Sequence, residues 1–241
     1  MTYCVGLLLD AGMVLLSDTR TNAGLDNIAI YRKSFVFERP GERVIAIMTA
    51  GSLSVTQTTI ARLEEAMTDI EPDPTTSILH APTMLQVAQI IGRALSEISA
   101  DVAERMDRAA QNVTASMIVA GQRKGGGMRM FLIYPEGNFI EATADTPFLQ
   151  IGEHKYGKPI LDRVVRPETS LADATKAVLL SMDSTLRSNL SVGMPLDLTV
   201  IPRDELAVGL ARRIEPDDGN FQEMSRAWSQ ALRDAFAGIQ V

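Results

Sequence analysis

Thr2 is the residue whose type and position could do chemistry most directly, because it follows the initiator methionine. A methionine that precedes a small residue can be removed, and Thr2 would then carry both a hydroxyl and a free α-amine. One residue would thus supply a nucleophile and its own base. An unperturbed α-amine titrates at about 7.7–8.0, which suits a general base. The structural alternative is that Thr2 simply precedes an early first strand.

The start of the chain predicts which side chains lie near Thr2. Two apolar runs flank Asp10-Ala11-Gly12, which suits a three-residue hairpin loop. A turn centred on Ala11 places Cys4 opposite Asp18. Because side chains alternate along a strand, we expect Asp18 on the face of Thr2, diagonal to it and within reach.

Lys33 is expected to supply a cation beside Thr2. It opens a predicted strand in which Phe35 and Phe37 share its face, so its ammonium is desolvated unless it is paired. Asp18 is the nearest candidate partner in this arrangement. A lysine cation there would lower the pKa of the α-amine by charge repulsion, and it would stabilise the alkoxide that forms during attack.

Gly51 is a candidate oxyanion donor, because Ala50-Gly51-Ser52 lies where a predicted strand runs into a helix. Backbone N–H groups at a helix start point outward with the helix dipole. Each partner also has a structural alternative: Asp18 could cap a turn, Lys33 could extend its charge to water, and Gly51 could be a hinge. The three together are harder to explain structurally than any one alone.

Composition restricts the class of protein. The chain has 241 residues, of which 46% are hydrophobic and 22% charged, as in ordinary globular proteins. A net charge of -7 argues against a nucleic-acid partner. The sequence contains neither an apolar run of membrane-helix length nor a signal-peptide pattern, so we expect a cytoplasmic protein without a membrane partner. One cysteine and two scattered histidines predict no disulfide, no metal site and no cofactor.

The order of the predicted elements indicates the fold class. Four strands, two helices, three strands, a helix, two strands and a helix favour antiparallel sheets with segregated helices. Each helix has one apolar stripe, as an outer layer requires. Ser52 is expected to cap the first helix, and residues 19–27 to form a polar loop. We therefore expect residues 1–241 to form a single α+β domain with helices at 53–67, 82–106, 171–190 and 221–236.

Several of these stretches resemble a known family. Thr2, residues 17–20, Lys33 and the Ala50-Gly51 corner resemble the β-subunits of proteasome-like threonine proteases, of the N-terminal-nucleophile hydrolase class. Longer stretches resemble the bacterial ancestral β-subunit family, Anbu, and the similarity covers essentially the whole chain; these stretches are 17–24, 151–162 and 181–185.

The resemblance implies a four-layer αββα sandwich of two antiparallel sheets. It also implies a subunit that self-associates into rings or a stacked helical assembly. Thr2 would be the nucleophile, Asp18 and Lys33 its partners, and Gly51 the oxyanion donor.

Two stretches differ from the proteasome pattern. Proteasome subunits have Gly-Ser-Gly near the nucleophile, and the comparable stretch of this chain is Gly152-Glu153-His154. They also have an Asp-x-x-Ser-Gly stretch that supports the terminus, of which this chain keeps only Ser191 as a candidate supporting residue. We expect a threonine-type peptidase or amide hydrolase acting on a peptide or amide substrate, and leave a separate ATP-dependent partner open. Two alternatives remain: a proteasome-like scaffold with weak or no catalysis, and an amidohydrolase for small amides or isopeptides.

Overall fold

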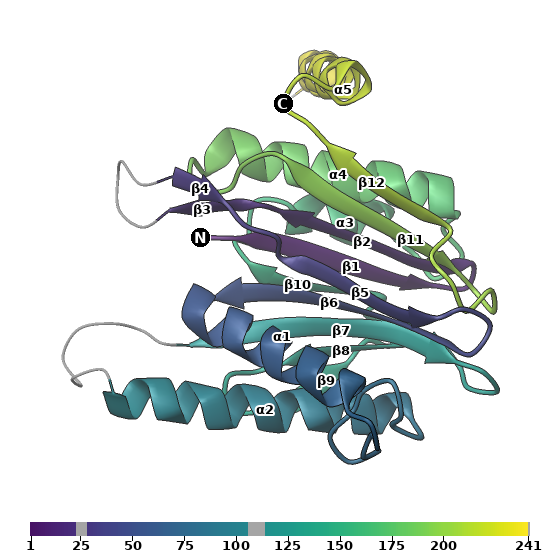
Figure 1. Cartoon of the computed structure of the whole chain (residues 1–241). Coiled ribbons are helices and arrows are strands. Elements are labelled where there is room, and N and C mark those ends of the chain that lie inside the picture. The colour runs from purple at the N-terminus through teal and green to yellow at the C-terminus, as the bar shows by residue number, and fades with distance from the viewer. Residues whose placement is uncertain (23–27, 106–113, 241) are drawn as a thin grey trace.

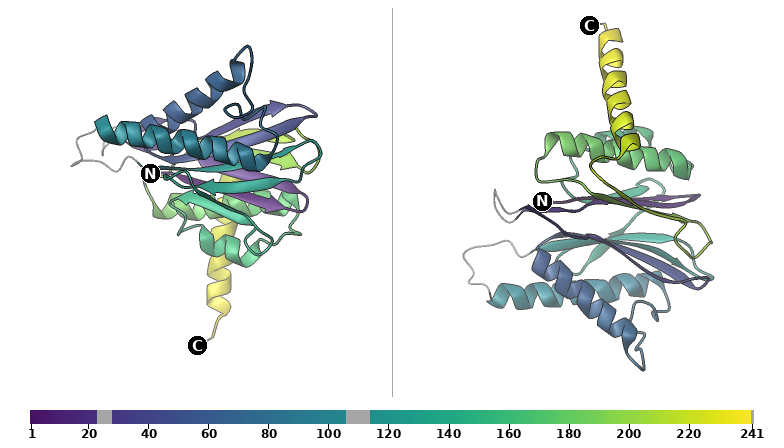
Figure 2. Two further views of the ribbon diagram at one scale, coloured as in Figure 1. Left: turned by 90° about the horizontal axis from the view of Figure 1, so that it is seen from below. Right: turned by 45° about the horizontal axis from the view of Figure 1, so that its top comes forward.

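Two five-stranded antiparallel sheets lie face to face between layers of helices (Figure 1). The structure is a computed structural model, and it describes residues 1–22, 28–105 and 114–240. The right-hand view of Figure 2 shows the layers edge-on, with the two sheets in the middle and helices on both outer faces. The predicted αββα sandwich is thereby confirmed.

The first sheet contains both strands of the N-terminal hairpin, which directly follows the candidate nucleophile. Its strands run in the order β10-β1-β2-β11-β12. Their bounds are Phe148–Gly152 for β10, Tyr3–Leu9 for β1, Gly12–Asp18 for β2, Leu196–Pro202 for β11 and Leu210–Ile214 for β12.

The second sheet runs in the order β5-β6-β7-β8-β9, and a separate two-stranded sheet pairs β3 with β4. The bounds are Ser34–Arg39 for β5, Arg43–Gly51 for β6, Ala115–Arg123 for β7, Arg129–Ile133 for β8, Phe139–Glu141 for β9, Arg20–Asn22 for β3 and Ile28–Ile30 for β4.

Helices α1 and α2 cover the second sheet, and α3 and α4 cover the first (Figure 1). Helix α5 projects away from the sandwich (Figure 2). The bounds are Leu53–Thr68 for α1, Met84–Arg105 for α2, Lys158–Val164 for α3, Leu171–Ser188 for α4 and Gly219–Gly238 for α5. None of the helices within the described ranges is long and apolar enough to cross a membrane.

The apolar core has three layers, as alternation along the strands requires. On the first sheet, Tyr3 and Leu16 face α3 and α4, whereas Cys4 and Leu15 pack between the sheets. A third cluster fills the space between the second sheet and α1 and α2. Each sheet is therefore buried on both faces, which explains why its strands contain near-continuous apolar runs.

The hairpin register differs by one residue from the prediction. Cys4 pairs with Ser17, not with Asp18, because the loop contains only Asp10 and Ala11. A two-residue loop moves every pair by one position, and a one-residue shift exchanges the two faces of a strand. The predicted reason for placing Asp18 near Thr2 is therefore wrong.

Several elements were missed or misassigned. Residues 20–22 form β3 instead of a polar loop, while 23–27 lie outside the described residues. The sequence analysis did not predict β10 or α3. Ser52 precedes α1 but makes no side-chain cap; its hydroxyl contacts that of Ser54. The predicted end of the second helix at Met106 also falls outside the described residues, since α2 is described as far as Arg105.

Phe131 offers a test of the packing beneath α2. Its ring is fully buried and meets that of Phe139 edge-on, with the centroids 5.5 Å apart. We expect Phe131→Ala to lower the free energy of unfolding by about 3–5 kcal/mol, because a large cavity would remain. The matched control is Ile140→Ala in β9, a side chain that is 47% exposed and should cost under about 0.5 kcal/mol. Urea denaturation of both variants measures this, and equal losses would contradict the assigned packing.

Candidate active site

Thr2 lies just before β1 and is held through its main chain. Its carbonyl oxygen accepts the N–H of Glu153 at 2.7 Å, at the end of β10. The residue is only 8% exposed, whereas Met1 is 60% exposed. The second residue is therefore fixed in the fold, and the first extends toward solvent.

Gly152 allows β10 to end this close to Thr2. Its φ is +80°, a conformation that favours glycine. A Cβ added to it would lie 1.9 Å from the carbonyl oxygen of Thr2, far inside van der Waals contact. Glycine at position 152 is thus required by backbone geometry at the candidate nucleophile. The sequence analysis noted this stretch only as a departure from the proteasome pattern.

Asp18 lies at the end of β2 with its carboxylate fully buried. One carboxylate oxygen, Oδ1, accepts the main-chain N–H of Tyr3 at 3.1 Å and the ammonium of Lys33 at 2.8 Å. The other oxygen, Oδ2, accepts the N–H of Gly193 at 3.2 Å. The carboxylate reaches the candidate site because it replaces a ladder partner of Tyr3, not because it shares a strand face with Thr2.

Lys33 lies between the two sheets, one residue before β5. Its Nζ donates to Asp18 and to the carbonyl oxygen of Arg20 at 2.5 Å, and it lies 3.5 Å from the carbonyl oxygen of Met1. The side chain is 6% exposed, so its charge depends on these acceptors. The predicted face shared with two phenylalanines is wrong, because those rings pack toward α1 and α2; they are Phe35 and Phe37.

The electrostatics of the site combine burial and paired charge. Burial raises the pKa of the Asp18 carboxyl above its ordinary value, and Lys33 together with two N–H donors opposes that rise. Burial also lowers the pKa of the Met1 α-amine, and the Lys33 ammonium lowers it further. An amine at this end of the chain is thus shifted toward its neutral form, which is the form that can accept a proton.

Gly51 lies at the end of β6, where the second sheet meets the start of α1. It lines a cleft of about 440 Å³ together with Gly152 and His154. Its φ is +108°, and a Cβ there would lie 2.3 Å from the carbonyl oxygen of Thr114. The candidate oxyanion corner and the corner that anchors Thr2 therefore face the same cleft.

Ser191 belongs to the loop between α4 and β11. Its N–H donates to Asn189 Oδ1 at 2.9 Å, and the contact from this loop to Asp18 comes from Gly193. The supporting role assigned to Ser191 stays a prediction. The hydrogen bond from Gly193 had no sequence signal, because it uses only the main chain.

Tyr3 adds a buried polar contact that the sequence analysis missed. Its hydroxyl lies 2.6 Å from Ser181 Oγ in α4 and accepts the Nε2–H of Gln150 in β10 at 2.6 Å. Burial raises the pKa of Tyr3 to about 12. These bonds join β1, β10 and α4 directly behind Thr2.

Within the described ranges, no group of three or more His, Cys, Asp or Glu side chains is arranged to hold a metal ion. The polar groups at this end of the chain are a hydroxyl, an amine, a lysine–aspartate pair and backbone N–H groups.

The fold and this arrangement define a proteasome-type subunit. The model of the proteasome subunit family matches residues 2–201. No curated protein matches the chain. Three solved structures illustrate the similarity.

The chain is 49% identical to Anbu from Hyphomicrobium sp. strain MC1, covering 99% of this chain and 98% of that one, with a TM-score of 0.90. It is 41% identical to Anbu, the ancestral beta-subunit, from Yersinia bercovieri, covering 99% and 98% with a TM-score of 0.91. It is 42% identical to a chain of the helical assembly of the Anbu complex from Pseudomonas aeruginosa, covering 99% and 97% with a TM-score of 0.92. The chain belongs to the proteasome subunit family and, within it, to Anbu.

Tyr3 gives a prediction about pH. The folded state keeps its hydroxyl protonated up to about pH 12, whereas an unfolded tyrosine ionises at its ordinary value of 10.0. The stabilisation is therefore complete below pH 10 and is lost as pH rises through 12. Tyr3→Phe should cost about 1–3 kcal/mol near neutrality, because Ser181 and Gln150 lose a partner. That difference should shrink by about 1.4 kcal/mol between pH 9 and pH 11. Denaturant titrations at both pH values measure it, and a constant difference would contradict the assignment.

Proposed function

We propose that this chain is an amide-bond hydrolase that uses Thr2 as its nucleophile after removal of Met1. The supporting observation is the position of Lys33, whose ammonium lies 2.8 Å from Asp18 and 3.5 Å from the carbonyl oxygen of Met1. That carbonyl is bonded to the nitrogen of Thr2, so removal of Met1 would leave a free amine close to a fixed cation.

In the proposed reaction the Thr2 amine accepts the proton of its own hydroxyl. The hydroxyl oxygen then attacks the carbonyl carbon of the substrate, and the resulting oxyanion is held by the N–H that we assign to Gly51. The amine returns its proton to the leaving nitrogen as the carbon–nitrogen bond breaks. Water, deprotonated by the same amine, then cleaves the ester and restores Thr2. Lys33 favours the neutral amine and stabilises the alkoxide, and Asp18 holds Lys33 in place.

We also propose that the chain self-associates through α5. Phe221 is the only buried residue of this helix. Large apolar side chains at its end are exposed to solvent; they are Leu232 at 50%, Phe236 at 81% and Ile239, directly after the helix, at 71% exposure. Figure 2 shows the helix projecting away from the sandwich. An apolar stripe on a projecting helix requires a partner, and the similar chain from Pseudomonas aeruginosa forms a helical assembly.

Glu153 supports a second candidate function, a scaffold with little catalysis. The charge of Glu153 raises the pKa of the terminal amine, which opposes the effect of Lys33. It stands where the proteasome pattern has a serine. Hydrolysis of small amides or isopeptides is a third candidate, since the cleft of about 440 Å³ is within the range of small-ligand sites.

The nucleophile can be tested by labelling. Protein from the native host should lack Met1 by mass spectrometry, and a threonine-directed electrophile should add once, at Thr2. Thr2→Ala should abolish labelling and lower any amide hydrolysis by a factor of about 10³ or more. Ser54→Ala, a hydroxyl deletion at the start of α1, is the control and should label normally. Met1 retained in all molecules would exclude the proposal.

The scaffold and the hydrolases are separated by Lys33→Ala, assayed on peptides and on short amides. Turnover that falls with loss of Lys33 excludes the scaffold, and the preferred substrate length separates the two hydrolases. Turnover unchanged by Lys33→Ala would contradict the assigned role of the lysine.

The assembly is tested by adding charge to the exposed stripe of α5. Phe236→Asp should shift the chain from large species to small ones, because it places a carboxylate in the proposed contact. Gln230→Asp adds the same charge on the opposite side of the helix and should leave assembly intact. Sedimentation velocity measures both variants, and identical distributions would exclude α5 as the contact.

A further inference from the structure

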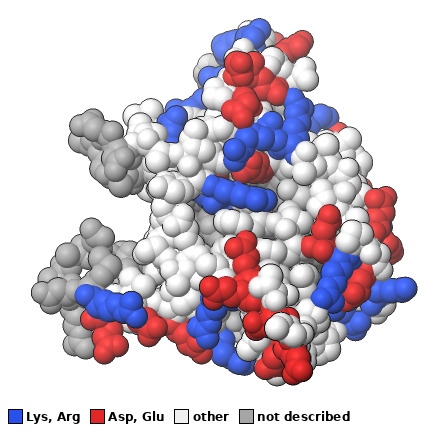
Figure 3. Space-filling view, in the orientation of Figure 1, with Lys and Arg blue, Asp and Glu red and all other residues white. Residues whose placement is uncertain are grey.

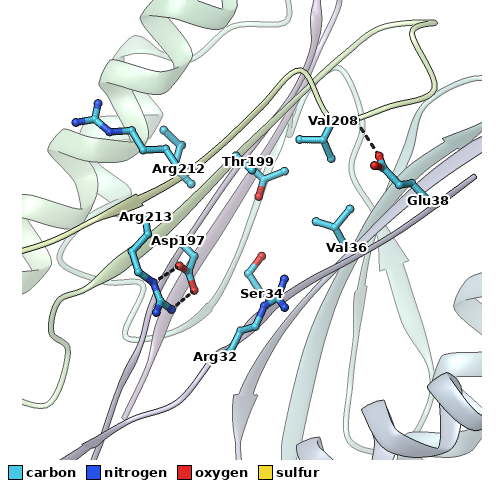
Figure 4. Close-up of a pocket in the computed structure, with 11 residues that line it drawn as sticks. Arg32, Ser34, Val36, Glu38, Asp197, Thr199, Val208, Arg212 and Arg213 are labelled. Carbon is cyan, nitrogen blue, oxygen red and sulfur yellow. Dashed lines mark hydrogen bonds and ion pairs between the residues drawn. The ribbon is translucent and has the colours of Figure 1, made fainter. Parts of the chain in front are cut away.

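A second cleft opens between the two sheets at the edge formed by β5 and β12 (Figure 4). Its volume is about 550 Å³, within the range of sites for small ligands. Inward-facing residues of β5 form one wall, and residues of β11 and β12 form the other. Thr2 does not line this cleft, although the lining includes Arg32 and Ser34, the two residues that flank Lys33.

Two hydroxyls on largely buried residues face each other across this cleft. Ser34 is 4% exposed and Thr199 is 5% exposed, and Figure 4 shows their oxygens directed toward one another from opposite walls. Neither side-chain hydroxyl has a hydrogen-bond partner among the described residues. Both oxygens can therefore donate to and accept from a ligand placed between the walls.

The two ends of the cleft carry opposite charges. Arg32 lies at one end beside Ser34, where its Nε donates to the carbonyl oxygen of that residue at 2.6 Å. Glu38 lies at the other end and accepts the N–H of Val208 at 3.1 Å. Neither Arg32 nor Glu38 forms an ion pair within the part of the chain that the structure describes.

The remaining charges of the cleft are compensated. Arg213 pairs with Asp197 through two bonds of 2.9 and 3.1 Å, and Arg212 turns away toward Asp218 at the start of α5. Basic side chains gather in the middle of the face shown in Figure 3, over the start of β5 and the β12 edge. The Arg32 guanidinium also lies over the Phe35 ring, 5.3 Å from its centroid. Because neither Arg32 nor Glu38 has an ion-pair partner among the described residues, the cleft favours an elongated ligand that carries both charges.

We propose that this cleft binds short peptides of about three to five residues with free termini. The terminal carboxylate lies at Arg32, the terminal ammonium at Glu38, and the peptide amides between Ser34 and Thr199. Arg32 and Glu38 are six positions apart, or about 20 Å along an extended strand. Their own side chains shorten this span, and a peptide extends about 3.3–3.6 Å per residue. The apolar lining suits small apolar side chains; it consists of Val36, Val208 and Ala211.

Short peptides with free termini are also what the proposed hydrolysis would release, so the ligand class rests partly on the proposed function. Binding itself does not require Thr2. The Thr2→Ala chain therefore tests the cleft without any cleavage, and its result is independent of whether the enzyme proposal holds.

The experiment is calorimetric titration of the Thr2→Ala chain with Ala-Val-Val-Ala in three forms: free, N-acetylated and C-amidated. We expect saturable binding of the free form, weakened about tenfold by either block, because each block removes one charged contact. In the Glu38→Gln variant, N-acetylation should no longer weaken binding, whereas C-amidation still should. In the Arg32→Gln variant, C-amidation should no longer weaken binding, whereas N-acetylation still should. Thr199→Val, which deletes one facing hydroxyl, should weaken all three forms.

Glu223→Gln on the exposed surface of α5 is the control and should change nothing. Three outcomes would overturn the proposal: no saturable binding of the free tetrapeptide, equal binding of a doubly blocked tetrapeptide, or penalties that persist in Glu38→Gln and Arg32→Gln. If the native chain hydrolyses amides but one of these three outcomes is found, only the peptide-binding proposal is rejected. If the chain binds the peptide but hydrolyses no amide, only the proposed hydrolase function is rejected.

Discussion

The buried pair of Asp18 and Lys33 is the interaction on which the candidate site depends. Taking two charges out of water costs several kcal/mol per ion, and their attraction offsets that only when further hydrogen bonds complete the site. Here the carboxylate accepts two main-chain N–H groups, and the ammonium reaches two carbonyl oxygens. The pair is thus surrounded by backbone groups from separate elements, and removing either partner would leave an uncompensated buried charge.

The same contacts fix the geometry of the chain end. Tyr3 bonds to Asp18 through its N–H and to Ser181 and Gln150 through its hydroxyl. The carbonyl of Thr2 is held by the residue that follows β10. The peptide group between Thr2 and Tyr3 is thus held through both its N–H and its carbonyl oxygen, which leaves Thr2 little freedom of position. This preorganisation is what a reaction at the second residue would need, since the lysine acts only over a short distance.

Much of the fold followed from the sequence, because apolar periodicity and turn residues determine the order and type of most elements. The pairing of Asp18 with Lys33 also followed, although by faulty reasoning. A loop shorter by one residue changed the register, and the carboxylate meets the lysine at the end of β2, where the same oxygen also accepts the N–H of Tyr3. Sequence patterns carry no information on such main-chain contacts. The short strand β10 was not predicted for a related reason. It contributes to the site through the backbone of Gly152 and Glu153, which side-chain patterns do not reveal.

Burial and three charged side chains together set the pKa of the terminal amine. Burial and the lysine lower the pKa of the amine, whereas Asp18 and Glu153 raise it. Asp18 is tied to the lysine, so its charge is largely compensated at the distance of the amine. Glu153 has no such partner among the described residues, and its main chain is fixed to Thr2. Glu153 therefore opposes part of the downward shift in the pKa of the amine without reversing it. An amine at this end of the chain thus depends chiefly on burial and on Lys33, and the carboxylate that stands where the proteasome pattern has a serine reduces their effect.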